Sequence, residues 1–224
     1  MHYCFTNRFG GLSEATYESF NLGLHVNDNP LHVKHNRERL REQVDVSKVV
    51  FMNQVHGDNV VVISGDEPTP TCDAMITNQK GIALAVMVAD CIPILLYDPV
   101  HEAIGVVHAG RSGSALHVGT RCIETMHKNY GSMAKEMKIW MGPCIRECCY
   151  EVGKEVTVGL EKCLHVKQNR YFLDLPLFNK EDFLALGVEE KNIMDSKICT
   201  CCEKEYFSYR RDTITGRFAG VICL

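Results

Sequence analysis

The sequence of 224 residues lacks the features of several protein classes. No apolar run approaches the roughly 20 residues that a membrane-spanning helix needs, and the first residues contain no apolar signal region. The 24 Lys and Arg residues are slightly outnumbered by 28 Asp and Glu residues, and no basic patch dominates. We also find no internal repeat, low-complexity tract or long linker. The sequence therefore predicts a cytoplasmic globular protein whose main partner is neither a nucleic acid nor a membrane.

Cysteine, by contrast, is abundant, with 12 residues. In a small secreted protein this number would indicate a disulfide framework. This chain is long enough to fold around its own core and shows no signal region, so we expect reduced thiols. Most of them would then be packing residues, since a free cysteine behaves as a small hydrophobic side chain.

Hydrophobic periodicity predicts helices and strands along the whole chain. The predicted helices span residues 31–44, 113–130, 151–163 and 176–186. The predicted strands span residues 49–52, 60–63, 74–77, 82–88, 92–97, 103–107, 138–141, 206–209 and 218–223, with loops at 10–30 and 64–71. The runs between 73 and 108 are almost continuously apolar, which is typical of strands covered on both faces. We expect residues 1–224 to form a single layered α/β domain, in which helices cover a mixed sheet.

Three potential metal ligands, His56, Cys91 and His108, stand at or near the ends of predicted strands. Two imidazoles and one thiolate suit zinc, and a fourth position left to water would make the site catalytic. The ligands lie too far apart in sequence for a zinc finger or ribbon. Taken singly, each has an ordinary reading as a turn-capping histidine, a core cysteine or a strand-end histidine. Their shared position, where α/β folds place active sites, favours the metal site.

The residues after His108 form a turn that leads into a predicted helix. Arg111 and Ser112 stand in this turn. The unpaired N–H groups of a helix start, together with the charge of Arg111, would favour a phosphate or carboxylate beside the metal. The alternative is an ordinary turn in which Ser112 or Ser114 caps the helix.

A second candidate binding segment joins Tyr209 to Arg210 and Arg211. An aromatic ring can stack on a base, and guanidinium groups bind phosphate or carboxylate through paired hydrogen bonds. The alternative is a cluster of surface ion pairs.

Two carboxylates, Asp73 and Asp90, lie next to the predicted strand ends. Either could act as a general acid or base, or could orient a ligand histidine. Asp90 is the less favoured of the two, because an extended segment would point its side chain away from the face that presents Cys91.

Two further groups of cysteines stay ambiguous. The segment 143–149 is similar to the Pro-Cys-x-x-Cys half of zinc deaminases, but its spacing differs by one residue and no matching His-x-Glu surrounds His108. Cys199, Cys201 and Cys202 could hold a second metal or form a redox pair. Without a clean four-ligand pattern, the sequence favours core and surface thiols.

Together, these motifs resemble the YfiH family, also called the laccase-domain or polyphenol-oxidase-like family. The matching stretches, in chain order, are Thr6–Ser13, Asn21–Gly23, Asn36–Arg37, Asn53–Gly57, Ala89–Pro93, His108–Gly110, Gly142–Ile145, Cys149–Gly153, Phe207–Asp212 and Thr215–Arg217. Because they follow one another over nearly the whole length, the resemblance extends to the entire chain.

The resemblance implies a layered α/β fold and a metal site formed by His56, Cys91 and His108, with zinc as the metal and copper as the alternative. It implies phosphorolysis of adenosine, inosine, guanosine and methylthioadenosine, with adenosine deamination at the same site. The implied partners are a small nucleoside and phosphate. We therefore predict catalytic roles for the three ligands and for Asp73, and substrate contacts for Arg111, Ser112, Tyr209, Arg210 and Arg211.

One departure from the family pattern concerns the anion. Arg111 and Ser112 stand where the family commonly has Trp-Arg. Ser112 cannot replace the charge of an arginine, and Arg111 starts one position earlier. We therefore expect the balance between phosphorolysis and deamination to differ from that of relatives with Trp-Arg.

Two other activities stay open. Some family members are described as copper-dependent phenol oxidases, although a multi-copper centre would need more ligands than these three. A cysteine hydrolase acting in peptidoglycan editing would need no metal, with Cys91 as nucleophile and His56 or His108 as base. Metal analysis discriminates all three activities.

Overall fold

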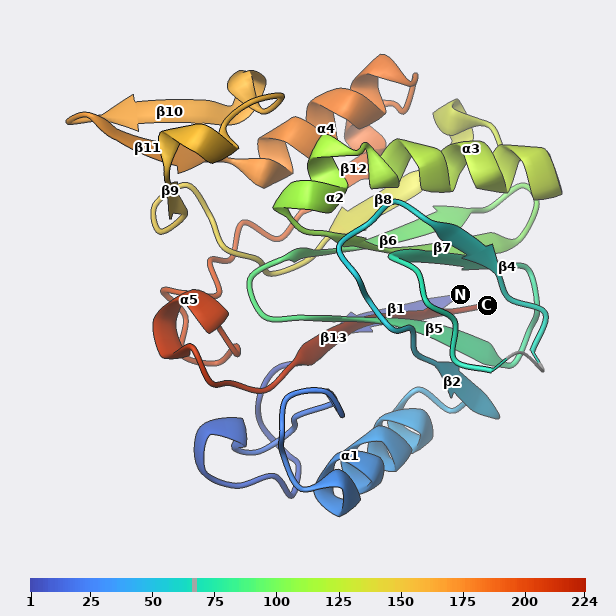
Figure 1. Ribbon diagram of the computed structural model, residues 1–224. Helices are drawn as coiled ribbons and strands as arrows, with labels where there is room; N and C mark the ends of the chain where they lie inside the picture. Colours follow the sequence, from blue (N-terminus) through green and yellow to red (C-terminus); the bar gives the residue numbers. More distant parts are fainter. Residues whose placement is uncertain (66–67) are drawn as a thin grey trace.

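The structure is a computed structural model that describes residues 1–65 and 68–224, and its strands form three sheets (Figure 1). The four-stranded sheet contains, in spatial order, β1 (His2–Phe5), β13 (Phe218–Cys223), β5 (Ile82–Val88) and β2 (Lys48–Val50). The six-stranded sheet contains β12 (Ile193–Asp195), β8 (Lys138–Met141), β6 (Ile92–Asp98), β7 (Ala103–Ala109), β4 (Ala74–Thr77) and β3 (Val60–Val62). The small sheet contains β10 (Leu164–Lys167), β11 (Arg170–Leu173) and β9 (Glu151–Val152).

The helices of the described residues are mostly short. The α-helices are α1 (Pro30–Gln43), α2 (Arg111–Ala115), α3 (Val118–Tyr130), α4 (Leu175–Ala185) and α5 (Tyr209–Asp212). Single 3-10 turns span Ala15–Tyr17, Ala134–Glu136, Lys154–Val156, Glu161–Cys163 and Glu190–Asn192. Among these residues, no helix has both the length and the apolar character to cross a bilayer.

The two larger sheets stack on one another and share an apolar core (Figure 1). Leu84 and Val86 of β5 and Phe218 of β13 belong to one buried cluster with Leu95 of β6 and Val106 of β7. Strands β6 and β7 are antiparallel neighbours over seven residue pairs. The centre of the molecule is therefore an apolar layer between two sheets.

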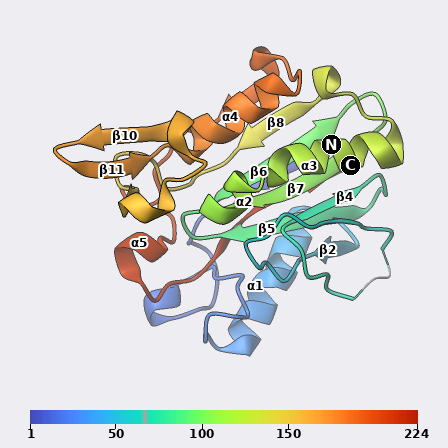
Figure 2. The same ribbon diagram turned by 45° about the horizontal axis from the view of Figure 1, so that its top comes forward.

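Helices cover the outer faces of this pair of sheets (Figure 2). Helix α1 adds Leu40 to a cluster on the outer side of the four-stranded sheet. Helices α3 and α4 add Cys122 and Phe183 to a cluster on the outer side of the six-stranded sheet. In β6, Leu95 belongs to the inter-sheet cluster and Ile94 to the helix-side cluster. The continuous apolar runs thus come from strands covered on both faces, and the predicted layered α/β fold is confirmed, with two stacked sheets in place of one.

The predicted helix 113–130 is divided in two. His117 has a φ of 58°, in the left-handed region, and it separates α2 from α3. A residue in this conformation interrupts the right-handed turn on either side. The helix that directly follows His108 therefore has only five residues.

The predicted helix 151–163 and the predicted strand 206–209 are wrong. Residues 151–152 pair with β11, and Gly159 has a φ of 81°, which a helix interior does not allow. At 206–209 the chain instead leads into α5, because the Ser208 side chain accepts a hydrogen bond from the Arg211 N–H and caps the helix. The sequence patterns also missed β1, β10, β11 and β12. Of the predicted loop 64–71, residues 66 and 67 lie outside the described part of the chain.

Candidate metal centre

Three separate segments bring His56, Cys91 and His108 together. His56 lies in the loop between β2 and β3, Cys91 in the turn between β5 and β6, and His108 in β7. One ligand atom from each residue lies within 4.8 Å of the others, and the two imidazole centroids are 4.7 Å apart. Two nitrogens and one sulfur are ligands that zinc prefers, and three protein ligands leave a coordination position open. The donor set and its spacing therefore fit a catalytic zinc ion.

The turn that carries Cys91 also joins the two stacked sheets, since β5 belongs to one and β6 to the other. Asp90 has a φ of 93° in this turn, and its carboxylate accepts hydrogen bonds from the Thr200 hydroxyl (2.7 Å) and the Arg210 backbone N–H (2.6 Å). His56 has a φ of 60°. Positive φ values are costly for residues other than glycine, and they persist where surrounding contacts hold them. The backbone is thus held in unusual conformations at two points of the site.

Gly110 leaves room for two of the ligands. A Cβ atom at this position would lie 2.9 Å from Cys91 Sγ and 3.1 Å from His56 Nδ1. Any larger residue would push these groups apart. The glycine of the His-Ala-Gly sequence therefore has a direct steric role in the centre.

Asp73 lies buried behind the centre and orients two of its ligands. One carboxylate oxygen is 2.8 Å from His108 Nδ1, and the carboxylate also accepts hydrogen bonds from the backbone N–H groups of Val55, His56 and Gly57. Burial raises the pKa of Asp73, but the bonds from His108 and these N–H groups outweigh it and hold the pKa below its usual range. Asp73 does not line the cavity described below, which favours the orienting role over the acid–base role.

The ligands also set one another's charge. Burial alone would raise the pKa of the Cys91 thiol, but the charges of His108 and His56 and their hydrogen bonds lower it to about 6. Burial likewise opposes the charge on His108, yet Cys91 and Asp73 raise the pKa of this imidazole to about 9. The site therefore favours the thiolate of Cys91, which is the form that binds a metal.

A cavity of about 500 Å³ opens over the three ligands. Of the residues predicted to contact substrate, Tyr209 and Arg210 line it. The Arg210 guanidinium lies 5.2 Å from the centroid of the Tyr150 ring, and its Nη1 donates to the Cys149 carbonyl (2.9 Å). This wall of the cavity therefore combines two aromatic rings with a positive charge.

Arg211 points elsewhere. Its Nη1 donates to the Thr200 carbonyl at 2.8 Å, its Nη2 donates to the Tyr206 carbonyl at 2.8 Å, and it pairs with Asp212. Arg211 is not among the cavity-lining residues. Its contacts are those of a residue that holds the loop between β12 and α5.

Arg111 and Ser112 form the start of α2 and do not line the cavity either. The positive charge of Arg111 nevertheless acts on Tyr150, which lines the cavity. Burial and Cys91 raise the pKa of Tyr150, while the positive charges of Arg111 and Arg210 act in the opposite direction. Both arginines therefore contribute positive potential near Tyr150.

Residues outside the predicted set complete the cavity, among them His25, Gln54, Tyr150 and Arg217. Burial and the nearby charges of Arg217 and Arg37 lower the pKa of His25, which favours its neutral form. Gln54 is held by two hydrogen bonds to the Met87 backbone. Gln54, Tyr150 and Arg217 belong to stretches that carry the family resemblance, and this was the sequence signal that could have identified them. His25 lies in the turn-rich segment 10–30 and had no such signal.

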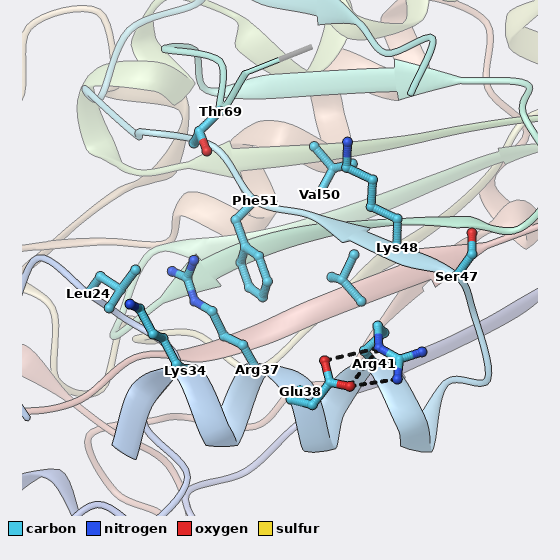
Figure 3. A pocket seen from close by; sticks show the side chains of 11 residues that line it. Leu24, Lys34, Arg37, Glu38, Arg41, Ser47, Lys48, Val50, Phe51 and Thr69 are labelled. Atoms are coloured by element: carbon cyan, nitrogen blue, oxygen red, sulfur yellow. Dashed lines mark hydrogen bonds and ion pairs between the residues drawn. The ribbon is translucent and has the colours of Figure 1, made fainter. Parts of the chain in front are cut away.

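A second hollow lies between α1 and β2 and has a different character (Figure 3). Arg37 lies 3.9 Å from the centroid of the Phe51 ring and donates to the Leu22 carbonyl, while Arg41 pairs with Glu38. The Arg41–Glu38 ion pair joins two of the charged side chains that line it, and none of the candidate metal ligands lines it.

Comparisons with known proteins find relatives that match nearly the whole chain. A family model described as multi-copper polyphenol oxidoreductase laccase matches residues 2–224. A purine nucleoside phosphorylase of Streptomyces griseus is 38% identical over 234 residues, which cover 100% of this chain and 94% of the relative. The purine nucleoside phosphorylase YfiH of Escherichia coli is 35% identical, covering 99% and 93%.

Solved structures extend the likeness to three dimensions. The crystal structure of the hypothetical protein YfiH of Bacillus licheniformis matches with a TM-score of 0.94 at 31% identity, covering 99% of this chain and 92% of that one. The structure of YlmD from Geobacillus stearothermophilus matches with a TM-score of 0.93 at 31% identity, covering 99% and 90%.

Proposed function

Because the chain belongs to the laccase-like family that includes the YfiH proteins, we propose that it is a zinc-dependent purine nucleoside phosphorylase. The substrates would be adenosine, inosine, guanosine and methylthioadenosine, and adenosine would also be deaminated at the same site. The observation that carries the proposal is one cavity in which His56, Cys91 and His108 meet aromatic and guanidinium groups.

The cavity is lined by groups that suit each part of a nucleoside. Its volume of about 500 Å³ lies within the range of roughly 300–1,000 Å³ that is usual for small-molecule sites. The Tyr150 and Tyr209 rings supply faces on which a purine can stack. Arg210 and Arg217 supply charge-assisted hydrogen bonds for phosphate or ribose oxygens. These groups would bind the base and the phosphate within one cavity.

The remaining residues position the metal ligands. A zinc ion held by His56, Cys91 and His108 would supply Lewis-acid chemistry toward an oxygen atom at the open coordination position. Asp73 keeps the Nδ1 atom of His108 engaged, so that Nε2 faces the centre. Gln54 ties the loop that carries His56 to β5 through the Met87 backbone. Little rearrangement would then be needed when substrate binds.

The test is metal analysis of protein purified without added metal, together with the release of free base from inosine in the presence and absence of phosphate. We expect zinc and phosphate-dependent release. Cys91→Ala should lose one equivalent of zinc and the activity. Cys4→Ala is a matched control, because Cys4 is a half-buried thiol in β1, remote from the centre.

Other outcomes would point to the alternative activities. Copper in place of zinc, with oxidation of phenols, would favour the oxidase. Hydrolysis of a peptidoglycan fragment by metal-free protein, abolished in Cys91→Ala, would favour the cysteine hydrolase. Full zinc and full base release in Cys91→Ala would exclude this centre as the active site.

A further inference from the structure

A second group of thiols lies apart from the centre described above. Cys148 and Cys149 belong to the segment between β8 and β9, and Cys199 and Cys202 belong to the segment between β12 and α5. The four sulfur atoms all lie within 4.8 Å of one another. About fifty residues separate the two pairs in the sequence, so the fold itself brings them together.

The distances between the sulfur atoms match those around a tetrahedral metal ion. Cys148 Sγ lies 3.7 Å from Cys149 Sγ and 3.9 Å from Cys202 Sγ, and Cys149 Sγ lies 3.4 Å from Cys202 Sγ. A zinc–sulfur bond of about 2.3 Å places the sulfurs of a regular tetrahedron about 3.8 Å apart. A disulfide would require about 2.05 Å. All twelve cysteines of the chain are free thiols in this structure.

The backbone hydrogen bonds between the two segments hold the two pairs of cysteines close together. The two segments are also joined directly, since the Cys144 N–H donates to the Ile198 carbonyl and the Thr200 N–H donates to the Cys144 carbonyl. The segments are therefore in register before any metal binds.

We propose that Cys148, Cys149, Cys199 and Cys202 form a second zinc site. Four thiolates complete the coordination of the ion, which makes the site structural rather than catalytic. Cys199 and Cys202 have the Cys-x-x-Cys spacing typical of zinc sites, and the adjacent pair Cys148 and Cys149 supplies the other half. Cys201 lies outside the group of four.

The proposed site braces one wall of the substrate cavity. The Cys149 carbonyl accepts a hydrogen bond from Arg210, and the next residue is Tyr150, whose ring lines the cavity. On the other segment, the Thr200 hydroxyl donates to Asp90, next to Cys91. A metal that ties the two segments together would therefore fix the wall against which Arg210 and Tyr150 are placed.

Zinc content per chain tests the proposal independently of any activity. Protein purified under reducing conditions should contain about two zinc ions, and the double variant Cys148→Ser, Cys202→Ser should contain one. Cys201→Ser is the matched control, because it removes a neighbouring thiol outside the group, and it should keep both ions. Cys91→Ala should also keep one ion, the one held by the four thiols.

Cobalt gives a second measurement that reports the ligands themselves. Apoprotein of the Cys91→Ala variant, titrated with Co²⁺, should develop the intense sulfur-to-metal charge-transfer bands of a tetrathiolate site. The bands should vanish when Cys148 and Cys202 are also changed to serine. If the variant with all three changes does not fold, the same titration of Cys91→Ala, Cys202→Ser apoprotein should show weakened bands.

Three results would overturn the proposal. The first is an equal zinc content in wild-type protein and the folded double variant. The second is the absence of thiolate–cobalt bands in the Cys91→Ala apoprotein. The third is a mass deficit in the unreduced protein that maps a disulfide between the two segments. None of these results depends on whether the protein cleaves nucleosides.

Discussion

The environment of Asp73 shows how one buried carboxylate can control a metal ligand. Its replacement by Asn would retain the shape but not the charge beside His108. We expect Asp73→Asn to lower zinc affinity at the candidate centre about 10- to 100-fold, the usual effect of losing a partner that orients a ligand. Competition with a chelator measures this affinity.

A control for Asp73→Asn exists within the same chain. Asp98 is also fully buried and also contacts a histidine, with 2.8 Å between its Oδ2 and His101 Nδ1. Asp98→Asn should leave the zinc affinity unchanged. Equal losses of affinity in both variants would indicate general destabilisation instead of a specific effect on His108.

The two neighbouring arginines of α5 should respond differently to mutation. Arg210 lines the cavity, so Arg210→Ala should lower kcat/KM for nucleoside about tenfold to a hundredfold, with zinc at the candidate centre retained. Arg211 instead donates to backbone carbonyls, so Arg211→Ala should mainly lower the free energy of unfolding. Kinetics, zinc analysis and denaturant unfolding on both variants test this division. Wild-type kcat/KM in Arg210→Ala would contradict it.

The charge balance of the metal-free centre predicts an unusual pH dependence for Cys91. Its pKa is lowered to about 6, so the reactive thiolate should persist at neutral pH and disappear as the pH falls below about 6. Alkylation of chelator-treated protein, followed by peptide mass spectrometry, measures the rate at each pH. Burial raises the pKa of Cys72 to about 12, so this thiol is an internal reference that should stay unreactive. A Cys91 rate that rises only above about pH 8 would be inconsistent with the imidazole contacts.

At the level of elements, α2 differs from its prediction. The sequence pattern favoured one long helix here, whereas the structure has a five-residue helix that begins at Arg111. The serine at position 112 lies in its first turn. Ser112, which lacks the charge of the family arginine, is therefore only four residues from the ligand His108 in the sequence, but it does not line the cavity.

Adding that charge should strengthen phosphate binding if the proposed function holds. We expect Ser112→Arg to lower the Michaelis constant for phosphate, because the added guanidinium lies beside the start of α2 and can bind an anion bidentately. Ser112→Gln controls for side-chain length without charge. An unchanged constant in Ser112→Arg would mean that Arg210, Arg217 or Arg111 already supplies the anion contact.

At the scale of the whole molecule, the inter-sheet core should contribute strongly to stability. Leu95 is completely buried between the sheets. Leu95→Ala should lower the free energy of unfolding by about 2–5 kcal/mol, because it removes apolar contacts and leaves a cavity in a tightly packed layer. Leu31→Ala, at a position of α1 that is 72% exposed, should have little effect. Urea denaturation of both variants makes the comparison, and similar losses would argue against a dominant inter-sheet core.

The sequence by itself determined the features that depend on neighbouring residues. The apolar runs of β4 to β7 predicted buried strands because a strand covered on both faces needs apolar side chains at every position. The motifs around His56, Cys91 and His108 predicted a metal centre because these side chains are suitable ligands wherever they meet. Such patterns involve only neighbouring residues, so they can be recognised without knowledge of the fold.

Only the tertiary structure decided which distant segments meet. The division into two sheets, the contribution of His25 and Arg217 to the cavity, and the pairing of Cys148 and Cys149 with Cys199 and Cys202 all depend on contacts between remote parts of the chain. The same holds for Arg211, which is adjacent to Arg210 in sequence but bonds to carbonyl groups instead of facing the cavity. Adjacent side chains point in different directions, and the groups that each one contacts depend on how distant segments pack against it. A short stretch of sequence does not contain this information.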